Sequence, residues 1–235
     1  MAVNSQDAES VPVHVGLILD GNRRWARANG LPQLEGHRRG SDNLFEIARA
    51  ASERGVKFVS AFVFSTENWD RTQEEVDYLM DLIVWVATKE IDKYAKEGFR
   101  VVFLGSRKRL SPKVLRSIES AESKTKDGNG TVLALCFNYG GQTELAEGVA
   151  RLVADGVPAA EVTVERLERY LYHPEVPPID FLIRTSGEQR LSGFMLWRAN
   201  YAELYFSPQP WPAFTVSDLD EALAEFARRQ RRFGA

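Results

Sequence analysis

The chain of 235 residues carries 30 lysines and arginines against 33 aspartates and glutamates, and 44% of its residues are hydrophobic. These values exclude disordered, collagen-like and coiled-coil classes, and a chain this long can fold without disulfides or a structural metal. The net charge of -3 argues against a general nucleic-acid binder. A single cysteine, Cys136, excludes an intramolecular disulfide framework and a cysteine-based zinc site, and fits a reducing cytoplasm.

The order of apolar and polar segments predicts one α/β domain. Residues 1–12 lack the basic and apolar regions of a signal peptide and are expected to form a disordered tail before a domain at 13–235. No apolar run reaches the roughly 20 residues of a membrane span. Apolar runs predict strands at 14–19, 58–64, 99–104, 132–137, 179–183 and 202–206. Helical spacing predicts helices at 42–54, 74–96, 112–124, 144–155 and 216–232. This alternation is typical of a mainly parallel sheet of about six strands flanked by helices.

Polar clusters follow four of the predicted strands. They are DGNRRW at 20–25, STENW at 65–69, NYGG at 138–141 and RTSGE at 184–188. Each cluster alone would fit a capped loop. Ligands of open α/β sheets bind outside the carboxyl ends of the strands, so four such clusters at one edge predict a functional site.

The first cluster has the composition of a phosphate site. Gly21 lets a ligand approach the backbone, and Arg23 and Arg24 favour an anion. The Asp20 carboxylate would repel that anion unless it holds a divalent cation that bridges to the phosphate, as Mg²⁺ does with one or two carboxylates. The alternative is that Asp20 simply pairs with a neighbouring arginine.

A second basic set follows the fifth predicted strand. Arg184 and Arg190 belong to it, Ser192 lies beside them, and Arg198 is a further candidate. Two separated arginine sets indicate two phosphate-bearing ligands or one long one. A surface salt bridge between Arg190 and Glu188 is the alternative.

Two features suggest what lies beside the phosphates. The predicted helix 74–96 is apolar on more than one face, which fits either plain core or the wall of a hydrophobic pocket. His37, in a predicted Gly-His-Arg-Arg-Gly turn, is expected to donate a hydrogen bond to a phosphate, whereas His14 is expected in the core. A phosphate-binding rim above an apolar cavity indicates a lipid phosphate.

These motifs resemble the cis-prenyltransferase family, the undecaprenyl diphosphate synthase-like enzymes, over residues 14–234. The matching stretches are residues 14–26, GHRRG at 36–40, FSTENW at 64–69 with Arg71 and Glu75, NYGG at 138–141, IRTSGE at 183–188 with Arg190, Ser192 and Phe194, YAELYF at 201–206 and RRFG at 231–234.

The resemblance implies a homodimer that condenses isopentenyl diphosphate with an allylic diphosphate in a Mg²⁺-dependent reaction. It implies that Asp20 lies under the allylic diphosphate and its Mg²⁺, and that Glu203 is a further metal ligand, within one chain or across the dimer. The residues implied to bind the allylic diphosphate are Gly21, Asn22, Arg23, Arg24 and His37. Those implied to bind the second diphosphate are Arg184, Arg190 and Ser192.

The resemblance also implies roles near the second strand. Asn68, with Ser65 and Asp20, would serve proton removal from the homoallylic substrate. Further side chains are implied to contact substrate, or to position both the substrate and a mobile segment after Trp69. They are Trp25, Thr66, Glu67, Trp69, Arg71 and Glu75.

Several positions depart from the family pattern. Gln142 stands where an arginine is usual, Arg198 where a glutamine is usual, Gly193 where an asparagine is usual, and Thr72 where a proline is usual. These changes surround the expected allylic side and mobile segment, so the identity of donor and acceptor stays open. An irregular, head-to-middle coupling of two allylic diphosphates to a lavandulyl-type diphosphate is therefore the second hypothesis.

Bulky side chains bear on product length. The residues expected to line a tunnel are Val63, Leu79, Ile83, Val86 and Phe137. Val63 and Phe137 replace residues that are often smaller in the family, which predicts a narrow tunnel and a short product. A non-catalytic partner subunit is the third hypothesis, and the presence of Asp20, Asn68 and Glu203 argues against it.

Overall fold

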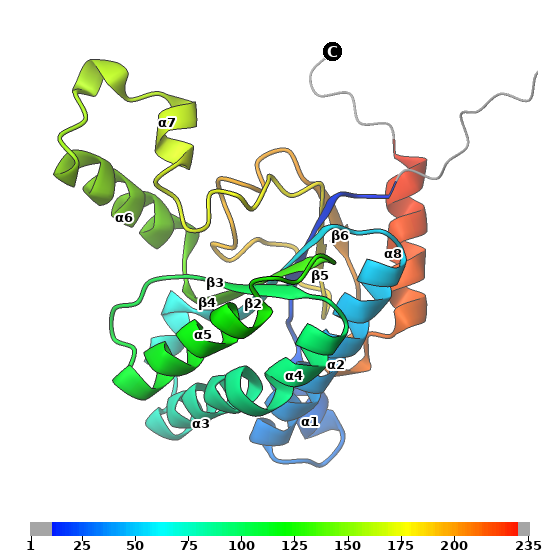
Figure 1. Cartoon of the computed structure of the whole chain (residues 1–235). Helices are drawn as coiled ribbons and strands as arrows, with labels where there is room; N and C mark the ends of the chain where they lie inside the picture. The colour runs from blue at the N-terminus through cyan, green and yellow to red at the C-terminus, as the bar shows by residue number, and fades with distance from the viewer. Residues whose placement is uncertain (1–10, 230–235) are drawn as a thin grey trace, which may run out of the picture.

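Six parallel strands form the centre of the protein, seen in a computed structural model that describes residues 11–229 (Figure 1). The strands are β1 (His14–Ile18), β2 (Phe58–Ser65), β3 (Arg100–Leu104), β4 (Val132–Tyr139), β5 (Phe181–Arg184) and β6 (Glu203–Phe206). Their order in the sheet is β3-β4-β2-β1-β5-β6. The single α/β domain with a six-stranded, helix-flanked sheet is confirmed.

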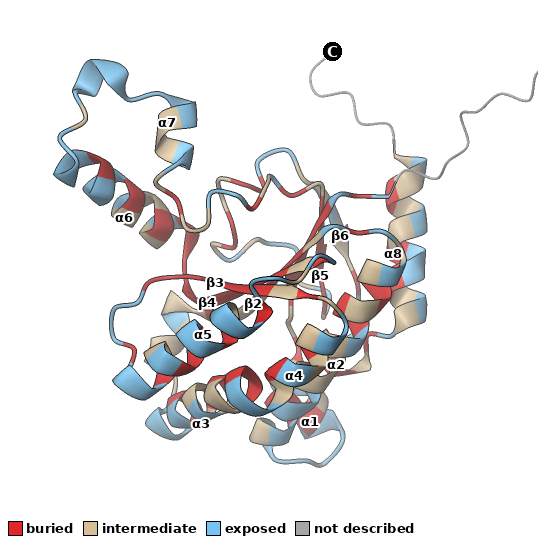
Figure 2. Ribbon diagram, viewed as in Figure 1, coloured by how far each residue is buried: buried red, intermediate tan, exposed pale blue. Residues whose placement is uncertain are grey.

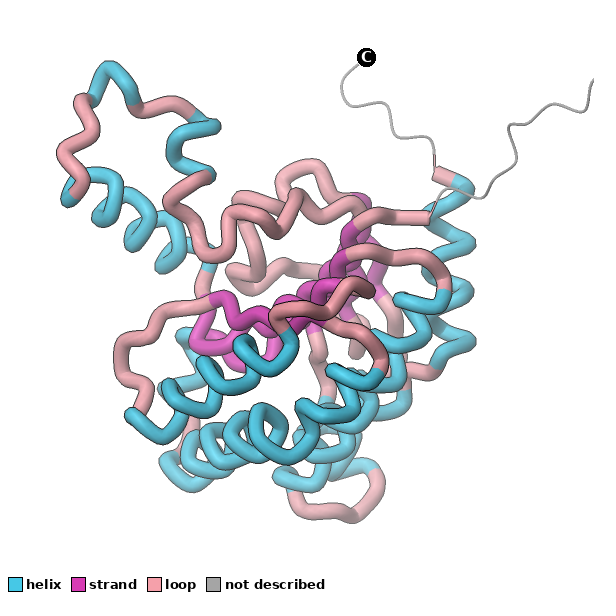
Figure 3. The backbone as a smooth tube through the Cα atoms, in the orientation of Figure 1, coloured by secondary structure: helices cyan, strands magenta, loops and turns pink. Residues whose placement is uncertain are grey.

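Helices cover one face of the sheet, and an irregular segment covers the other (Figures 1 and 3). The helices are α1 (Asn22–Ala28), α2 (Gln33–Glu53), α3 (Gln73–Trp85), α4 (Ile91–Lys96), α5 (Pro112–Thr125), α6 (Gly141–Ala154), α7 (Val164–Glu168) and α8 (Val216–Arg228). Of these, α2, α3, α4, α5 and α8 pack on the first face. Residues 172–179 and 191–202, on either side of β5, supply most of the cover on the second face.

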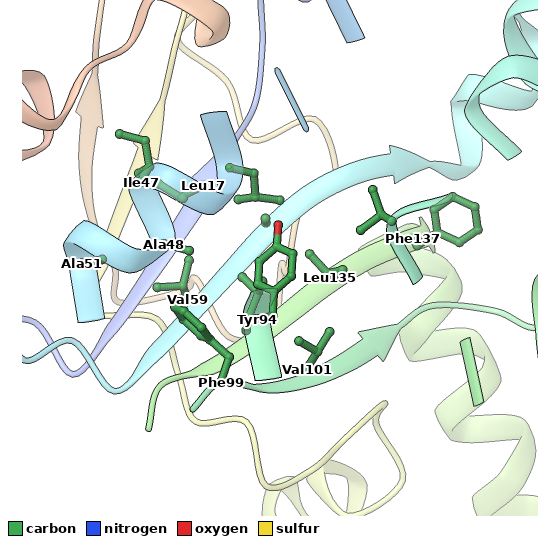
Figure 4. Packing of buried hydrophobic residues seen from close by; sticks show 14 of the residues in the cluster. Leu17, Ile47, Ala48, Ala51, Val59, Tyr94, Phe99, Val101, Leu135 and Phe137 are labelled. Atoms are coloured by element: carbon green, nitrogen blue, oxygen red, sulfur yellow. The ribbon is translucent and has the colours of Figure 1, made fainter. Parts of the chain in front are cut away.

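The alternation of side chains along the strands builds both cores. Val15 and Leu17 of β1 belong to the helical-side core, whereas Ile18 belongs to the other. Figure 2 shows the buried strands between the layers, and Figure 4 shows residues of the helical-side core, including Val59 and Leu135. Burying each such aliphatic side chain contributes about 1.5–3 kcal/mol, so the runs that predicted the strands also stabilise them.

The helix predicted at 42–54 begins earlier, at Gln33, so His37 lies in α2 and not in a turn. Two glycines explain the difference. A Cβ atom on Gly36 would lie 2.2 Å from the carbonyl oxygen of Asn22, and one on Gly40 would lie 2.4 Å from Oδ1 of Asn22. These glycines let α2 approach α1 closely, and in the sequence they resemble turn residues.

Other boundaries shift by a few residues. The helix predicted at 74–96 is α3, a π-helical segment (Val86–Glu90) and α4 in succession. Strand β4 runs on to Tyr139, so Phe137 lies inside the strand and does not end it. Residues 1–10 and 230–235 lie outside the described residues, and with them most of the expected tail, the end of the helix predicted at 216–232 and the RRFG motif.

The connectivity places the predicted site. After β4 the chain crosses to the far side of β1, so the carboxyl ends of β1 and β5 lie next to each other. Open α/β sheets bind ligands at such a switch point. Within residues 11–229, no helix is long and apolar enough to cross a bilayer.

Candidate active site

Asp20 follows β1 and pairs with two arginines. Its Oδ2 accepts a hydrogen bond from Nη2 of Arg184 at 2.8 Å, and its Oδ1 lies 3.1 Å from Nη2 of Arg24. Burial alone would raise the pKa of Asp20, but the hydrogen bonds and charges of Arg184 and Arg24 outweigh burial and hold the pKa below its usual value. The carboxylate is therefore ionised at neutral pH, and the alternative that Asp20 pairs with neighbouring arginines holds in this structure.

Gly21 makes the turn that brings α1 to this strand end. Its φ of 101° is left-handed, and a Cβ atom there would lie 2.7 Å from Oγ of Ser186 and 2.8 Å from Cβ of Pro210. Because only glycine fits, the chain can reverse directly after Asp20 and start α1 at Asn22. This places Asn22, Arg23 and Arg24 at the same sheet edge as Asp20.

Arg184 joins the two arginine sets. Its side chain is buried, and Nη1 donates a hydrogen bond to Oγ of Ser192 at 2.8 Å and another to the carbonyl oxygen of Arg190. Arg190 forms an ion pair with Glu188, which is the surface salt bridge considered as the alternative role. Glu188 also lies 3.1 Å from Arg24. The predicted second set of Arg184, Arg190 and Ser192 therefore gathers beside the first.

Arg198, the further candidate for that set, lies elsewhere. Its buried guanidinium pairs with the Glu144 carboxylate at 2.8 Å and donates to the carbonyl oxygens of Tyr172 and Val176. A buried guanidinium needs several acceptors, and the loop packed on the second face of the sheet supplies them. Arg198 thus fastens this loop to α6.

Two buried polar atoms point to a ligand. Across residues 11–229, the buried side-chain nitrogen and oxygen atoms that lack a hydrogen-bond partner are Oδ1 of Asn22 and Nε of Arg184. Both lie at the candidate site, one in each arginine set. Since buried polar groups are normally paired, an unpaired acceptor and an unpaired donor among the predicted site residues make this edge of the sheet a candidate for ligand binding.

The segment after β2 forms a short 3₁₀ helix, η1 (Thr66–Asp70), that carries further predicted residues. Oδ1 of Asn68 accepts a hydrogen bond from the backbone N–H of Ser65 at 3.1 Å, as part of a capping box. Nε1 of Trp69 donates to Oδ1 of Asn138 at 2.8 Å. Oγ1 of Thr66 lies 3.2 Å from Glu67, whose side chain is exposed.

Glu75 gathers two guanidinium groups and one histidine. Its buried carboxylate lies 3.0 Å from Nε2 of His37, 2.8 Å from Nη1 of Arg71 and 3.6 Å from Nη1 of Arg23. Burial alone would raise the pKa of Glu75, yet the neighbouring cations, Arg71 foremost, lower it overall. The pKa of His37 is lowered, chiefly by burial. A neutral His37 thus donates its Nε2 proton to Glu75, so a bond from His37 to a phosphate would need a second proton on Nδ1.

A polar pocket and an apolar cavity adjoin at this edge. The pocket, of about 320 Å³, contains the Asp20 carboxylate among cationic side chains. Its lining residues are Leu19, Asp20, Gly21, Asn22, Arg23, Arg24, Arg27, His37 and Arg71. The cavity shares Leu19, Asn22, His37 and Arg71 with it, so the two spaces meet at these residues. Trp25, on α1, lines neither space.

The cavity lies between the sheet and the helices and has a volume of about 130 Å³. All five residues expected to line a tunnel contribute to its wall, namely Val63, Leu79, Ile83, Val86 and Phe137, and Asn68 adds a polar group. Tyr94 and Trp211 also line it and were missed. The apolar periodicity of helix 74–96, extended past Val86, would have included Tyr94. No local pattern could have indicated Trp211, which reaches the cavity from the segment before α8.

The donor set fits a magnesium ion only together with a diphosphate. Asp20 supplies one carboxylate, and no group of three or more acidic, histidine or cysteine side chains within residues 11–229 could hold a metal. One carboxylate plus phosphate oxygens is a usual Mg²⁺ environment. Glu203 lies away from the Asp20 of its own chain, at the opposite edge of the sheet. It starts β6 beside Phe181, which pairs with Val15 at the amino end of β1. The Glu203 carboxylate forms an ion pair with Arg229.

Comparisons with known proteins find one family and a similar fold. Residues 18–234 match the model of a family described as "Putative undecaprenyl diphosphate synthase". An isoprenyl transferase of Thermotoga maritima is 44% identical over 226 residues, covering 95% of this chain and 97% of that protein. A trans,polycis-polyprenyl diphosphate synthase of Thermobifida fusca is 42% identical, covering 96% and 82%. The structure of lavandulyl diphosphate synthase from Lavandula x intermedia, solved with dimethylallyl diphosphate, superimposes with a TM-score of 0.91 at 32% identity, covering 96% and 99%.

Proposed function

The chain belongs to this undecaprenyl diphosphate synthase family of prenyltransferases, and on that premise we propose that it condenses an allylic diphosphate with isopentenyl diphosphate. The reaction is Mg²⁺-dependent: a carbon–carbon bond forms between the two substrates, the allylic substrate loses its diphosphate group, and the homoallylic substrate loses one proton to leave a cis double bond. We place the enzyme in the cytoplasm and its product among the short-chain prenyl diphosphates.

One observation carries the proposal: an arginine-rich pocket with one carboxylate opens into an apolar cavity. A diphosphate headgroup fits the first space, and a prenyl tail fits the second. Charge that develops on a leaving diphosphate is stabilised by guanidiniums already held in place. An apolar cavity excludes water from the allylic cation.

Two groups of residues bind the two diphosphates. Asp20 and Arg24 hold the allylic diphosphate in the polar pocket, which Asn22 also lines. Mg²⁺, when bound, neutralises charge on the departing diphosphate. Arg184, Arg190 and Ser192 hold the second diphosphate, and the hydrogen bond from Arg184 to Ser192 keeps two of these side chains together.

Asn68 serves the proton that must leave the homoallylic substrate. It lies in the cavity wall beside Arg71, and the hydrogen bond from the Ser65 backbone orients its amide. In this position Asn68 would lie near the diphosphate-bearing carbon of the allylic substrate, where the new carbon–carbon bond would form.

A direct test is mass spectrometry and NMR of products from defined pairs of C5, C10 and C15 diphosphates. Turnover that requires isopentenyl diphosphate and yields a cis-configured, elongated chain supports the proposal. No turnover with any allylic partner in the presence of Mg²⁺ refutes it. Omission of Mg²⁺ should abolish turnover, which tests the metal requirement in the same assay.

The irregular coupling of two allylic diphosphates remains the second candidate. The likeness to lavandulyl diphosphate synthase, at a TM-score of 0.91, favours it. Incubation with dimethylallyl or geranyl diphosphate alone separates the two reactions. Product formation without isopentenyl diphosphate selects the irregular reaction, and its absence rejects that reaction.

We also propose a homodimer. Val13, Val164 and Tyr201 are exposed around one apolar groove, next to the amino end of β6 where Glu203 lies. A second chain seated there would cover these side chains and give Glu203 a route to a partner's site. Light scattering coupled to size-exclusion chromatography should return twice the monomer mass of 26.5 kDa. A monomeric mass at assay concentration would contradict the dimer.

A further inference from the structure

Trp69 is the residue through which η1 is tied to distant parts of the fold. Its indole packs edge-on against Phe64 with ring centres 5.3 Å apart, and its N–H donates to Asn138. The guanidinium of Arg109 lies over the ring, 4.4 Å from its centre. A single 3₁₀ turn is marginal by itself, so these contacts decide where η1 sits.

Arg109 comes from the loop between β3 and α5, and Asn138 lies near the end of β4. Both adopt left-handed backbone conformations, with φ of 66° and 51°. Nδ2 of Asn138 donates to the carbonyl oxygens of Ser106 at 2.7 Å and Lys108 at 2.9 Å, so Asn138 fastens that loop and Trp69 together. Strain held at two residues that meet on one tryptophan points to a functional constraint at that place.

Within residues 11–229, Arg109 has no carboxylate partner. Its side chain is exposed, and no carboxylate in the described chain forms an ion pair with it. Its neighbours differ: Arg107 lies 3.6 Å from Glu122, and Lys108 lies 3.1 Å from Glu147. A guanidinium stacked on an aromatic face is a recognised stabilising contact.

We propose that Arg109 is a positioning residue, which acts through Trp69 to hold η1 so that Asn68 and Arg71 stay in the wall of the cavity. The proposal rests on the proposed prenyl transfer, because it gives Arg109 a role in that same site. Asn68 lies one residue before Trp69, and Arg71 lies two residues after it. A shift of the indole therefore moves both cavity residues at once.

The test compares Arg109→Ala and Arg109→Lys with Lys108→Ala, a matched removal of a cation from the same loop. We expect Arg109→Ala to lower kcat/KM about tenfold, the scale of a lost cation–π contact. Arg109→Lys, which keeps a cation over the ring, should recover most of the rate. Lys108→Ala should behave as the wild type. Arg109→Ala should also speed amide hydrogen exchange in residues 65–71 without changing exchange in the strands.

A double-mutant cycle with Trp69→Leu identifies the route of action. If Arg109 acts through Trp69, Arg109→Ala should not lower kcat/KM further in a protein that already carries Trp69→Leu. Additive losses would overturn the proposal, because they would mean that Arg109 touches substrate directly. Faster exchange throughout the protein would overturn it as well, because the role would then be general stability.

The exchange experiment needs no substrate. If the wild type turned over no diphosphate pair, the proposed function would fail, while local exchange in residues 65–71 would still decide whether Arg109 holds this segment.

Discussion

Nη2 of Arg184 donates a hydrogen bond to Oδ2 of Asp20 across 2.8 Å and so ties the end of β5 to the end of β1. The same guanidinium donates to Ser192 in the second diphosphate set. One buried arginine therefore joins the proposed metal carboxylate to the proposed second substrate site. A change at Asp20 should be felt in both.

Replacing Asp20 should abolish most turnover while the fold survives. In Asp20→Asn the amide keeps its shape but loses the charge that pairs with Arg24 and Arg184 and that would hold Mg²⁺. We expect kcat to fall at least about a hundredfold, as when a preorganised charge contact is lost in other enzymes. Circular dichroism should remain unchanged. Asp127→Asn, which alters an exposed loop carboxylate, is the control, and a rate near that of the wild type for Asp20→Asn would refute the assigned role.

Trimming the cavity wall should lengthen the product. Phe137 is fully buried in β4 and lines the cavity opposite Leu79 and Ile83 of α3. Phe137→Ala removes the ring and leaves room for further prenyl units, at a cost to stability of about 3–5 kcal/mol. Phe137→Leu should lengthen the product less. Chromatography of the dephosphorylated products measures this, and a wild-type product that already matches long polyprenyl standards would contradict the short-product hypothesis.

His14 should make the protein less stable in mild acid. Its Nδ1 donates to the carbonyl oxygen of Pro177 at 2.8 Å, and its Nε2 accepts from the Ser60 hydroxyl at 2.8 Å. Burial, foremost, lowers the pKa of His14 to about 4. Between pH 6.5 and pH 4, His14 is protonated in the unfolded chain but stays neutral in the folded chain. The free energy of unfolding should therefore fall by about 3 kcal/mol by pH 4.

Urea unfolding at several pH values, in wild type and His14→Gln, isolates this contribution. His173 is the control with the opposite sign, because hydrogen bonding to Glu122, foremost, raises its pKa above the usual value. Its contribution is present below pH 6.5 and declines as the pH rises through the folded-state pKa. Equal acid slopes in wild type and His14→Gln would contradict the prediction for His14.

Removing one partner of the buried Arg198–Glu144 ion pair should lower the stability of the protein strongly. Arg198→Gln leaves the Glu144 carboxylate buried with neutral donors, among them the Tyr139 hydroxyl, and removes the donors to two loop carbonyls. Removing one partner of a buried pair costs about 3–5 kcal/mol. The double variant Arg198→Gln/Glu144→Gln should regain part of this loss. A loss below about 1 kcal/mol in the single variant, measured by chemical denaturation, would show that the pair is dispensable.

Patterns in the amino-acid sequence were enough to predict the class of fold and the edge of the sheet that carries the candidate site. Apolar runs marked the strands because a strand buried on both faces must be apolar over its whole length. The polar clusters that follow β1, β2 and β5 identified Asp20, Asn68 and Arg184 because parallel strands end at one edge. These are local patterns, and the fold preserves them.

The sequence patterns did not indicate which charged side chains pair with one another in the folded chain. Arg184 and Arg198 are both buried arginines near the same sheet, yet one pairs with Asp20 in the site and the other with Glu144 beneath a loop. Trp211 lines the cavity, and Arg109 stacks on Trp69, although each comes from a segment far away in the chain. Helix α2 could begin at Gln33 because Gly36 and Gly40 face α1. The partner of a buried charge, and the fit of a glycine, depend on packing between distant segments, which no window of sequence contains.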